Sequence, residues 1–189
     1  MDTERARKLI EQVLTKNRFE HSLRVADTAV TLAKRYDAPV EKVELAALLH
    51  DYAKCMTQDE LRNYIEKYDL PPTLLAYNSE LWHGPVGAMM MKYRYGVKDK
   101  DVLNAIYYHT TGRANMSLIE QIIFVADFIE PGRNHPGVEE VRELAEMNLV
   151  LAIQRTLRNS IIYLVNKNVT LYPDTFYAYN NFTVKGEFD

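Results

Sequence analysis

Apolar residues recur every three or four positions along most of this chain, and this spacing predicts helices. Over residues 17–36, one such stripe is formed by Val25, Ala29, Leu32 and Tyr36. This is the pattern of an amphipathic helix. Pro39 suits a first helical position and opens another apolar segment over residues 40–49. The pattern of residues 138–166 indicates one or two further long helices.

The boundaries of the predicted helices are marked by polar residues, glycines and prolines. Capping boxes, in which Ser, Thr or Asn precedes Glu by three positions, predict helix starts at Asn17–Glu20, Thr57–Glu60 and Ser117–Glu120. Helix ends are predicted at Pro71-Pro72, Gly96, Gly112 and Pro131-Gly132. Together these signals favour an all-α chain.

Composition supports the same fold class. Gly and Pro together make up about 7% of the 189 residues, against roughly 12% in average proteins. This shortage argues against a turn-rich sandwich or barrel. No repeat or Ser/Gly-rich linker interrupts residues 1–168, so we expect them to form one domain built as a helical bundle.

The end of the chain has a different pattern. Residues 169–182 are rich in Tyr and Phe and lack helical periodicity. We expect residues 169–189 to form a short aromatic-rich C-terminal extension that packs on the bundle, with a frayed end over residues 184–189.

Charge and cysteine content exclude some classes of protein. The formal net charge is −3 and the isoelectric point is about 6.0, which gives no support for binding a nucleic-acid polymer. Cys55 is the single cysteine, expected to be a small core residue, and it excludes an internal disulfide. The charged residues 1–8 and the lack of a long apolar run predict a cytoplasmic protein without membrane contact. A homodimer is compatible with the sequence.

Asp127 is the first candidate for chemistry, because it interrupts the apolar run of residues 122–129. A carboxylate buried in an apolar interior must be paired, hydrogen-bonded or bound to a metal. No basic residue lies four positions away in either direction, where Ile123 and Pro131 stand. Asp127 is therefore predicted to be a metal ligand or a buried hydrogen-bond acceptor.

Four histidines lie within or beside apolar helical stretches. One histidine on such a face would be interpreted as a core residue, but four of them together with two aspartates favour a metal centre. The six groups are His21, His50, Asp51, His83, His109 and Asp127. Imidazole and carboxylate ligands suit iron, manganese or zinc. Six ligands exceed the need of one tetrahedral ion, which indicates two ions bridged by a carboxylate.

The ordered pattern of these six groups resembles the HD-domain superfamily of metal-dependent phosphohydrolases. Local phrases are still more similar to the bacterial YqeK family of symmetrical diadenosine tetraphosphate hydrolases, and the resemblance covers roughly residues 5–170. The phrases are EHSLRV at 20–25, HDYAK at 50–54, LWHGP at 81–85, YHTTG at 108–112 and ADFIEPGR at 126–133.

The resemblance implies an α-helical HD-domain bundle that holds two metal ions, iron above all, although manganese and cobalt accept the same ligands. One ion would be held by His21, His50, Asp51 and Asp127. Asp51 would bridge to the second ion, completed by His83 and His109. A metal-bound hydroxide would then attack phosphorus and split diadenosine tetraphosphate into two ADP molecules.

A dinucleoside polyphosphate also needs cations from the protein. Lys54 lies four residues after His50 and Arg24 three residues after His21, so on helices both would face the ligands. Arg133 follows the Pro131-Gly132 turn, from which it could reach the site. With Asp51, we assign catalytic roles to Lys54 and Arg133. The predicted phosphate contacts are Arg24, Lys54, Arg133 and His135, with Arg113 a weaker candidate.

Other functions are compatible with the same ligand set. A related HD-type phosphohydrolase would act on deoxynucleotides or a cyclic nucleotide instead. A di-iron oxygenase would use the metals to activate dioxygen, and a non-catalytic nucleotide sensor would only bind. The cations near the predicted ligands favour a phosphate substrate over an oxygenase, and the complete set of six ligands argues against a non-catalytic sensor. The sequence contains no base-reading motif that would separate the nucleotide substrates.

Overall fold

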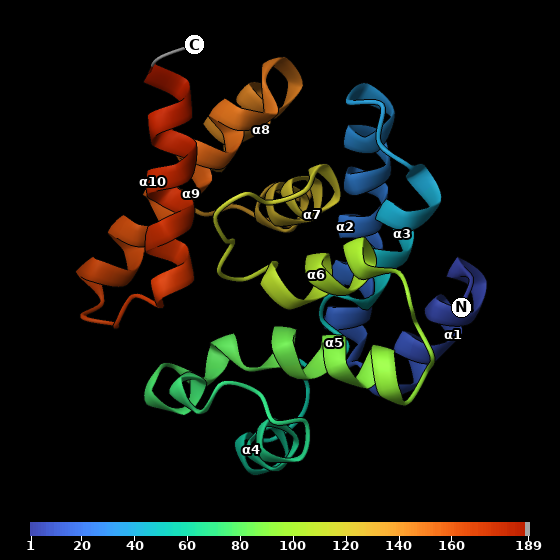
Figure 1. Cartoon of the computed structure of the whole chain (residues 1–189). Helices are drawn as coiled ribbons and strands as arrows, with labels where there is room; N and C mark the ends of the chain where they lie inside the picture. The colour runs from blue at the N-terminus through green and yellow to red at the C-terminus, as the bar shows by residue number, and fades with distance from the viewer. Residues whose placement is uncertain (188–189) are drawn as a thin grey trace.

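Ten α-helices and two short 3₁₀ helices make up the described part of the computed structural model (Figure 1). It describes the backbone of residues 1–187 and the side chains of residues 1–184, and this part contains no strand. The all-α prediction is confirmed. The elements are α1 (Thr3–Val13), α2 (Lys16–Arg35), α3 (Val40–Leu49), α4 (Gln58–Lys67), η1 (Pro72–Ala76), η2 (Ser79–Leu81), α5 (His83–Tyr93), α6 (Lys100–Tyr108), α7 (Leu118–Ile129), α8 (Val138–Met147), α9 (Leu149–Asn166) and α10 (Pro173–Glu187).

Helix α7 is the central element of the bundle. It packs against α2, α3, α6, α8 and α9, and Figure 1 shows these helices arranged around it. A helix that is apolar on all sides has to be buried, and α7 fits this rule. Its buried side chains are Ile119, Glu120, Ile122, Ile123, Phe124, Val125, Ala126 and Ile129. Asp127 is therefore carried to the edge of the interior by its apolar neighbours, and 22% of its side chain stays exposed.

Side-chain capping sets the start of two helices as predicted. Thr57 and Ser117 each accept a hydrogen bond from the backbone N–H three residues on, and the Glu at that position bonds back to the cap. The capping box expected at Asn17 is wrong, because α2 begins at Lys16 after an extended Thr15. Pro39 likewise precedes the first turn of α3 instead of opening it.

The segment of residues 138–166 forms two helices. Asn148 has an extended backbone and separates them, and its side chain accepts hydrogen bonds from the first N–H groups of α9. Such a cap satisfies donors that the helix cannot satisfy itself.

Helix α3 ends at Leu49, so its last turn delivers His50 and Asp51 to the interior. Residues 50–55 continue as turns, in which the N–H of Lys54 donates to the carbonyl of Asp51 at 2.9 Å. The spacing of Lys54 from His50 predicts that both lie on one face of a helix. This is wrong, because Lys54 reaches the site from a turn.

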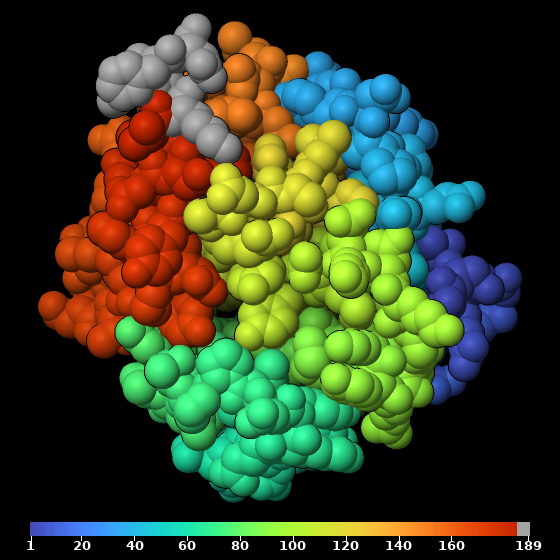
Figure 2. Space-filling view, viewed as in Figure 1, coloured from blue at the N-terminus to red at the C-terminus, as the bar shows by residue number. Residues whose placement is uncertain are grey.

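The aromatic tail folds as a helix, contrary to the non-helical expectation. Helix α10 packs on α9, with Ala178 and Phe182 buried. The side chain of Asn181 accepts a hydrogen bond from the N–H of Asn115, and Figure 2 shows α10 in red beside the yellow segment that precedes α7. The frayed end expected at residues 184–189 is helical as far as Glu187, and residues 188–189 lie outside the described residues.

Two further expectations concern the surface. Cys55 is exposed, so its prediction as a core residue is wrong, because the turns after α3 lift it away from the bundle. Among residues 1–187, none of the helices combines the length and the apolar character that crossing a bilayer would require.

Candidate metal centre

The structure brings all six predicted ligands to one place. Helices α2 and α7 and the ends of α3, α5 and α6 supply them, and five of the six residues are buried. The exception is the Asp127 side chain, which is 22% exposed. The six groups are His21, His50, Asp51, His83, His109 and Asp127.

Asp51 lies at the middle of the cluster, with each carboxylate oxygen facing a different pair of histidines. Its Oδ2 lies 3.8 Å from Nε2 of His21 and 3.6 Å from Nε2 of His50. Its Oδ1 lies 3.1 Å from Nε2 of His83 and 3.7 Å from Nε2 of His109. This arrangement suits a carboxylate that bridges two positively charged centres.

Asp127 completes the half of the cluster that contains His21 and His50. Its Oδ1 lies 3.0 Å from Nε2 of His21 and 3.9 Å from Nε2 of His50. In the other half, the Nε2 atoms of His83 and His109 are 3.0 Å apart. Two sets of donor atoms are close enough to share one ion each, namely His21, His50 and Asp127, and His50, Asp51 and His109.

The histidine rings are fixed through their Nδ1 atoms. In three of them Nδ1 lies within 2.8 Å of the backbone carbonyl three residues earlier; the pairs are His50 with Ala47, His83 with Glu80 and His109 with Ile106. Because a carbonyl only accepts, Nδ1 carries the proton in each ring. The Nε2 lone pair is then left pointing to the centre, as metal-binding histidines require.

Two of the ring nitrogens support the fit of the cluster to a metal ion. Nε2 of His50 and Nε2 of His21 are buried and make no hydrogen bond among the described residues, although Nε2 of His21 faces Oδ1 of Asp127 at 3.0 Å. A buried polar atom without a partner costs free energy, and coordination to a cation would remove that cost. Neutral imidazoles and carboxylates are suitable ligands for divalent iron, manganese, cobalt or zinc. These groups could therefore hold a divalent metal.

The pKa values of His50, Asp51 and Asp127 match the protonation states that metal ligands need. Burial lowers the pKa of His50 to about 4, so its ring is neutral at pH 7. Burial alone would raise the pKa of Asp51, but His50, His109 and His83 together hold it well below its usual value. The pKa of Asp127 is lowered in the same way by His21, His50 and Arg133, against the effect of burial. A neutral His50 thus faces ionised carboxylates.

Glu130 is a buried acidic residue that the sequence did not single out as functional. Its Oε1 lies 3.1 Å from Nδ1 of His21, and its Oε2 accepts hydrogen bonds of 2.6 Å from Arg24 and from the N–H of Gly132. Burial opposes ionisation, but these donors lower the pKa of Glu130 to about 2. A carboxylate on the outer nitrogen of a histidine orients the ring toward the metal.

Two of the predicted phosphate contacts border the cluster. Nζ of Lys54 forms a 2.8 Å ion pair with Glu80, whose side chain is 72% exposed. Nη2 of Arg133 lies 2.7 Å from Oδ1 of Asp127, and Nε of Arg133 donates to the carbonyl of the same residue. Both cations therefore stand at the edge of the metal-binding groups.

The other predicted phosphate contacts have partners outside the cluster. Arg24 is held by Glu130, on the outer side of the His21 ring. Arg113 is held by the buried Glu120, two turns of α7 before Asp127. Nε2 of His135 lies 3.2 Å from the backbone carbonyl of Phe128.

Arg18 is a cation at the site that the sequence reasoning missed. Its Nη1 lies 3.0 Å from Oδ2 of Asp51, and 36% of its side chain is exposed. It stands on α2 three residues before His21, so the helix repeat places both on one face. That spacing was the signal that could have found it.

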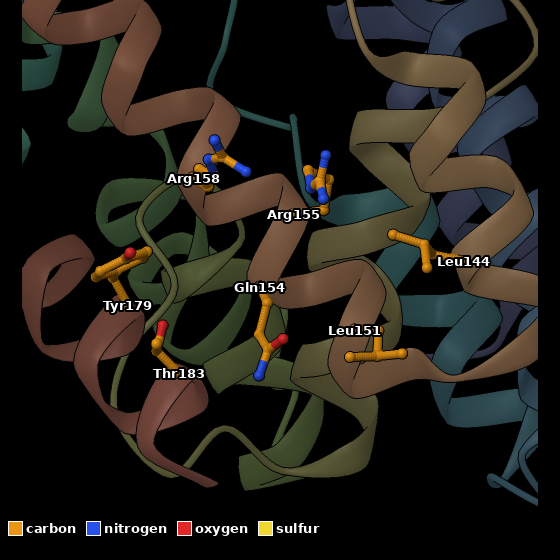
Figure 3. A pocket seen from close by; sticks show the side chains of 7 residues that line it. All are labelled: Leu144, Leu151, Gln154, Arg155, Arg158, Tyr179 and Thr183. Carbon is orange, nitrogen blue, oxygen red and sulfur yellow. The ribbon is translucent and has the colours of Figure 1, made fainter. Parts of the chain in front are cut away.

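The pockets of the molecule differ in chemistry. A small one of about 70 Å³ adjoins the cluster and is lined by Lys54, Glu80 and His83 among others. A larger one of about 390 Å³ lies between α8, α9 and α10 and contains none of the six groups (Figure 3). We favour the small pocket for the chemistry, because His83 of the cluster and the cation Lys54 both line it.

Comparison with known proteins agrees with this geometry. A protein-family model for the HD domain matches residues 18–132. A protein of Bacillus subtilis (strain 168) named "Bis(5'-nucleosyl)-tetraphosphatase, symmetrical" is 46% identical over 180 residues, covering 95% of this chain and 97% of the relative. A protein of the same name from Staphylococcus aureus (strain NCTC 8325 / PS 47) is 41% identical, with 99% and 97% covered.

A solved structure has the same fold. It is the crystal structure of a "predicted HD superfamily hydrolase involved in NAD metabolism" from Clostridium acetobutylicum. It superposes with a TM-score of 0.92 at 37% identity and covers 98% of both chains.

Proposed function

We propose that this chain, which belongs to the HD domain family, hydrolyses diadenosine tetraphosphate symmetrically into two molecules of ADP. One observation carries the proposal above all: four imidazole Nε2 atoms face Asp51 and Asp127 in one partly buried cluster. Near full-length similarity to enzymes named for this reaction supports the choice of substrate.

The proposed cofactor is a pair of divalent metal ions, with iron first and manganese or cobalt as alternatives. The support for two ions is the placement of Asp51, whose two oxygens face separate pairs of histidines. When bound, such ions make a coordinated water acidic and neutralise phosphate charge.

The side chains around the cluster would bind and orient the tetraphosphate. Lys54 is available for a phosphate oxygen, because its partner Glu80 is mostly exposed and an exposed ion pair contributes little. Arg133 stands beside Asp127 with 32% of its side chain exposed, so it can contact the substrate and hold the carboxylate in place. Positive groups preplaced around the phosphates stabilise the charge that develops during attack.

Symmetrical cleavage requires one water molecule and breaks one bond between the second and third phosphates. The attacked phosphorus keeps the water oxygen, and the other ADP leaves with the bridging oxygen and takes up a proton. The positions of Lys54 beside Glu80 and of Arg133 beside Asp127 support a role for both cations in stabilising the leaving phosphate.

The test is an assay of the metal-loaded protein with diadenosine tetraphosphate, in which the nucleotide products are separated by chromatography. We expect ADP as the sole nucleotide product and no turnover with Asp51→Asn. The products ATP and AMP would contradict symmetrical cleavage. Oxygen uptake without nucleotide cleavage would favour an oxygenase instead.

A further inference from the structure

We propose that Arg18 binds a phosphate of the substrate and forms a two-cation entrance to the metal centre together with Lys54. This inference rests on the proposed function and adds a residue to it. It starts from the contact between Nη1 of Arg18 and Oδ2 of Asp51, which are 3.0 Å apart.

The partner of Arg18, and not its exposure, distinguishes it from Arg24 and Arg133, whose side chains are about equally exposed. The only polar contact of Arg18 among the described residues is Asp51, and 36% of its side chain is open to solvent. Arg24, by contrast, is tied to the buried Glu130, which also holds His21. Arg18 thus spans the distance between solvent and the buried carboxylate.

The charges around Arg18 would favour the binding of an anion once metal ions occupy the centre. Oδ2 of Asp51 is the oxygen that faces His21 and His50, so a cation bound there would share this oxygen with the guanidinium. Two positive groups on one carboxylate oxygen repel each other. A phosphate oxygen between them would turn that repulsion into two attractive contacts, and a guanidinium is well suited to phosphate.

The charges of Arg18 and Lys54 both act on Glu80, although the two cations come from different elements. Lys54 comes from the turns after α3 and lines the small pocket with Glu80 and His83. The hydrogen bond from Lys54 is the largest cause of the lowered pKa of Glu80, and the charge of Arg18 adds to it. Glu80 is therefore an anion lying in the field of both cations, at a place that a substrate phosphate would take.

The experiment compares Arg18→Met and Arg18→Lys with Arg7→Met, an arginine exposed on α1. For each metal-loaded protein, kcat/KM with diadenosine tetraphosphate, the dissociation constant of ADP by calorimetry, metal content and thermal unfolding are measured. We expect Arg18→Met to lower kcat/KM and weaken ADP binding by about 10- to 100-fold, as for loss of a charged hydrogen bond. Metal content and unfolding should stay unchanged, Arg18→Lys should recover part of the loss, and Arg7→Met should match the wild type.

Unchanged ADP binding in Arg18→Met would overturn the inference. Loss of metal from the Arg18→Met protein would also overturn the inference, if the fraction that still holds metal binds ADP with normal affinity. Arg18 would then only neutralise the charge of Asp51. If the wild type binds ADP but does not cleave the tetraphosphate, the proposed function fails, while the ADP measurement still tests Arg18. The two failures can therefore be distinguished.

Discussion

Each of the four histidines in the cluster uses one ring nitrogen to fix its own position. Three are held by the backbone of their own helix turn, and His21 is held by Glu130 from a different helix end. A local hydrogen bond fixes a ring as soon as its helix forms. His21 depends in addition on how α2 and α7 pack, so its orientation is the one most open to change by mutation.

His50 should be essential for the metal centre. It is completely buried, and its Nε2 has no partner among the described residues. We expect His50→Ala to lose bound metal and to lower turnover by more than about 100-fold. Loss of a residue that only hydrogen-bonds to a metal ligand lowers activity by about 100-fold at most, and loss of the ligand itself should cost more. Elemental analysis and the ADP assay measure both effects. Retention of metal and of near-native turnover would remove His50 from the ligand set.

Glu130→Gln tests the orienting role of the buried carboxylate. We expect metal affinity to fall by about 10- to 100-fold, because a neutral amide holds the His21 ring less firmly. Metal titration of the metal-free protein measures the affinity. The matched control is Glu143→Gln, at an exposed position of α8. Equal affinities for the two variants would contradict the orienting role.

The sequence allowed the six ligands to be predicted but not the residues that support them. A His or Asp within an apolar stretch is unusual locally, so it can be recognised without knowledge of the fold. Arg18 and Glu130 look like ordinary charged residues, and their roles arise from partners 33 and 109 positions away. Only tertiary packing shows such contacts.

At the scale of elements, the turn after α7 is held by α8. Arg142 donates hydrogen bonds to the backbone carbonyls of Ile129, Glu130 and Arg133. The last carbonyls of a helix lack partners within it, so one side chain completes the end of α7 and fixes the turn. This turn carries both Glu130 and Arg133 to the centre.

Arg142→Met should therefore affect both stability and activity. We expect the free energy of unfolding to fall by about 2 kcal/mol, as for lost hydrogen bonds to a charged group, and kcat/KM to fall because Arg133 is less well placed. Urea unfolding and steady-state kinetics measure the two effects. An Arg142→Met protein with wild-type kcat/KM would show that the turn holds its shape without α8.

The helices were predictable where their signals are local. The capping boxes at Thr57 and Ser117 depend on residues three positions apart, and both formed. Helix α10 was not predicted, although its buried residues Ala178 and Phe182 have the four-residue spacing of a helix. The neighbouring aromatic residues Phe176 and Tyr177 are exposed and do not follow this spacing. The exposed aromatic residues hide the apolar stripe, and packing on α9 selects the helix.

At the scale of the whole molecule, the metal centre is distinct from most of the hydrophobic core. Helices α7, α8 and α9 bury apolar side chains that have no metal-binding group, including Ile122, Val141 and Ile153. Because burial of apolar area supplies most of the folding free energy, the bundle should not depend on the metal to fold.

Chelation tests this independence. We expect removal of metal to abolish turnover and to leave the far-ultraviolet circular dichroism spectrum largely unchanged. Metal at a hundred times its dissociation constant should raise the free energy of unfolding by about 2.7 kcal/mol. Collapse of the helical signal on chelation would instead show that the metal is a structural requirement.

The most direct measurement is anomalous X-ray scattering at the iron edge from crystals of the iron-loaded protein. It should give an anomalous difference peak enclosed by Nε2 of His21, Nε2 of His50 and the carboxylates of Asp51 and Asp127, with a second beside His83 and His109. A loaded protein whose scattering peak lies away from these side chains would contradict the metal centre on which the whole account depends.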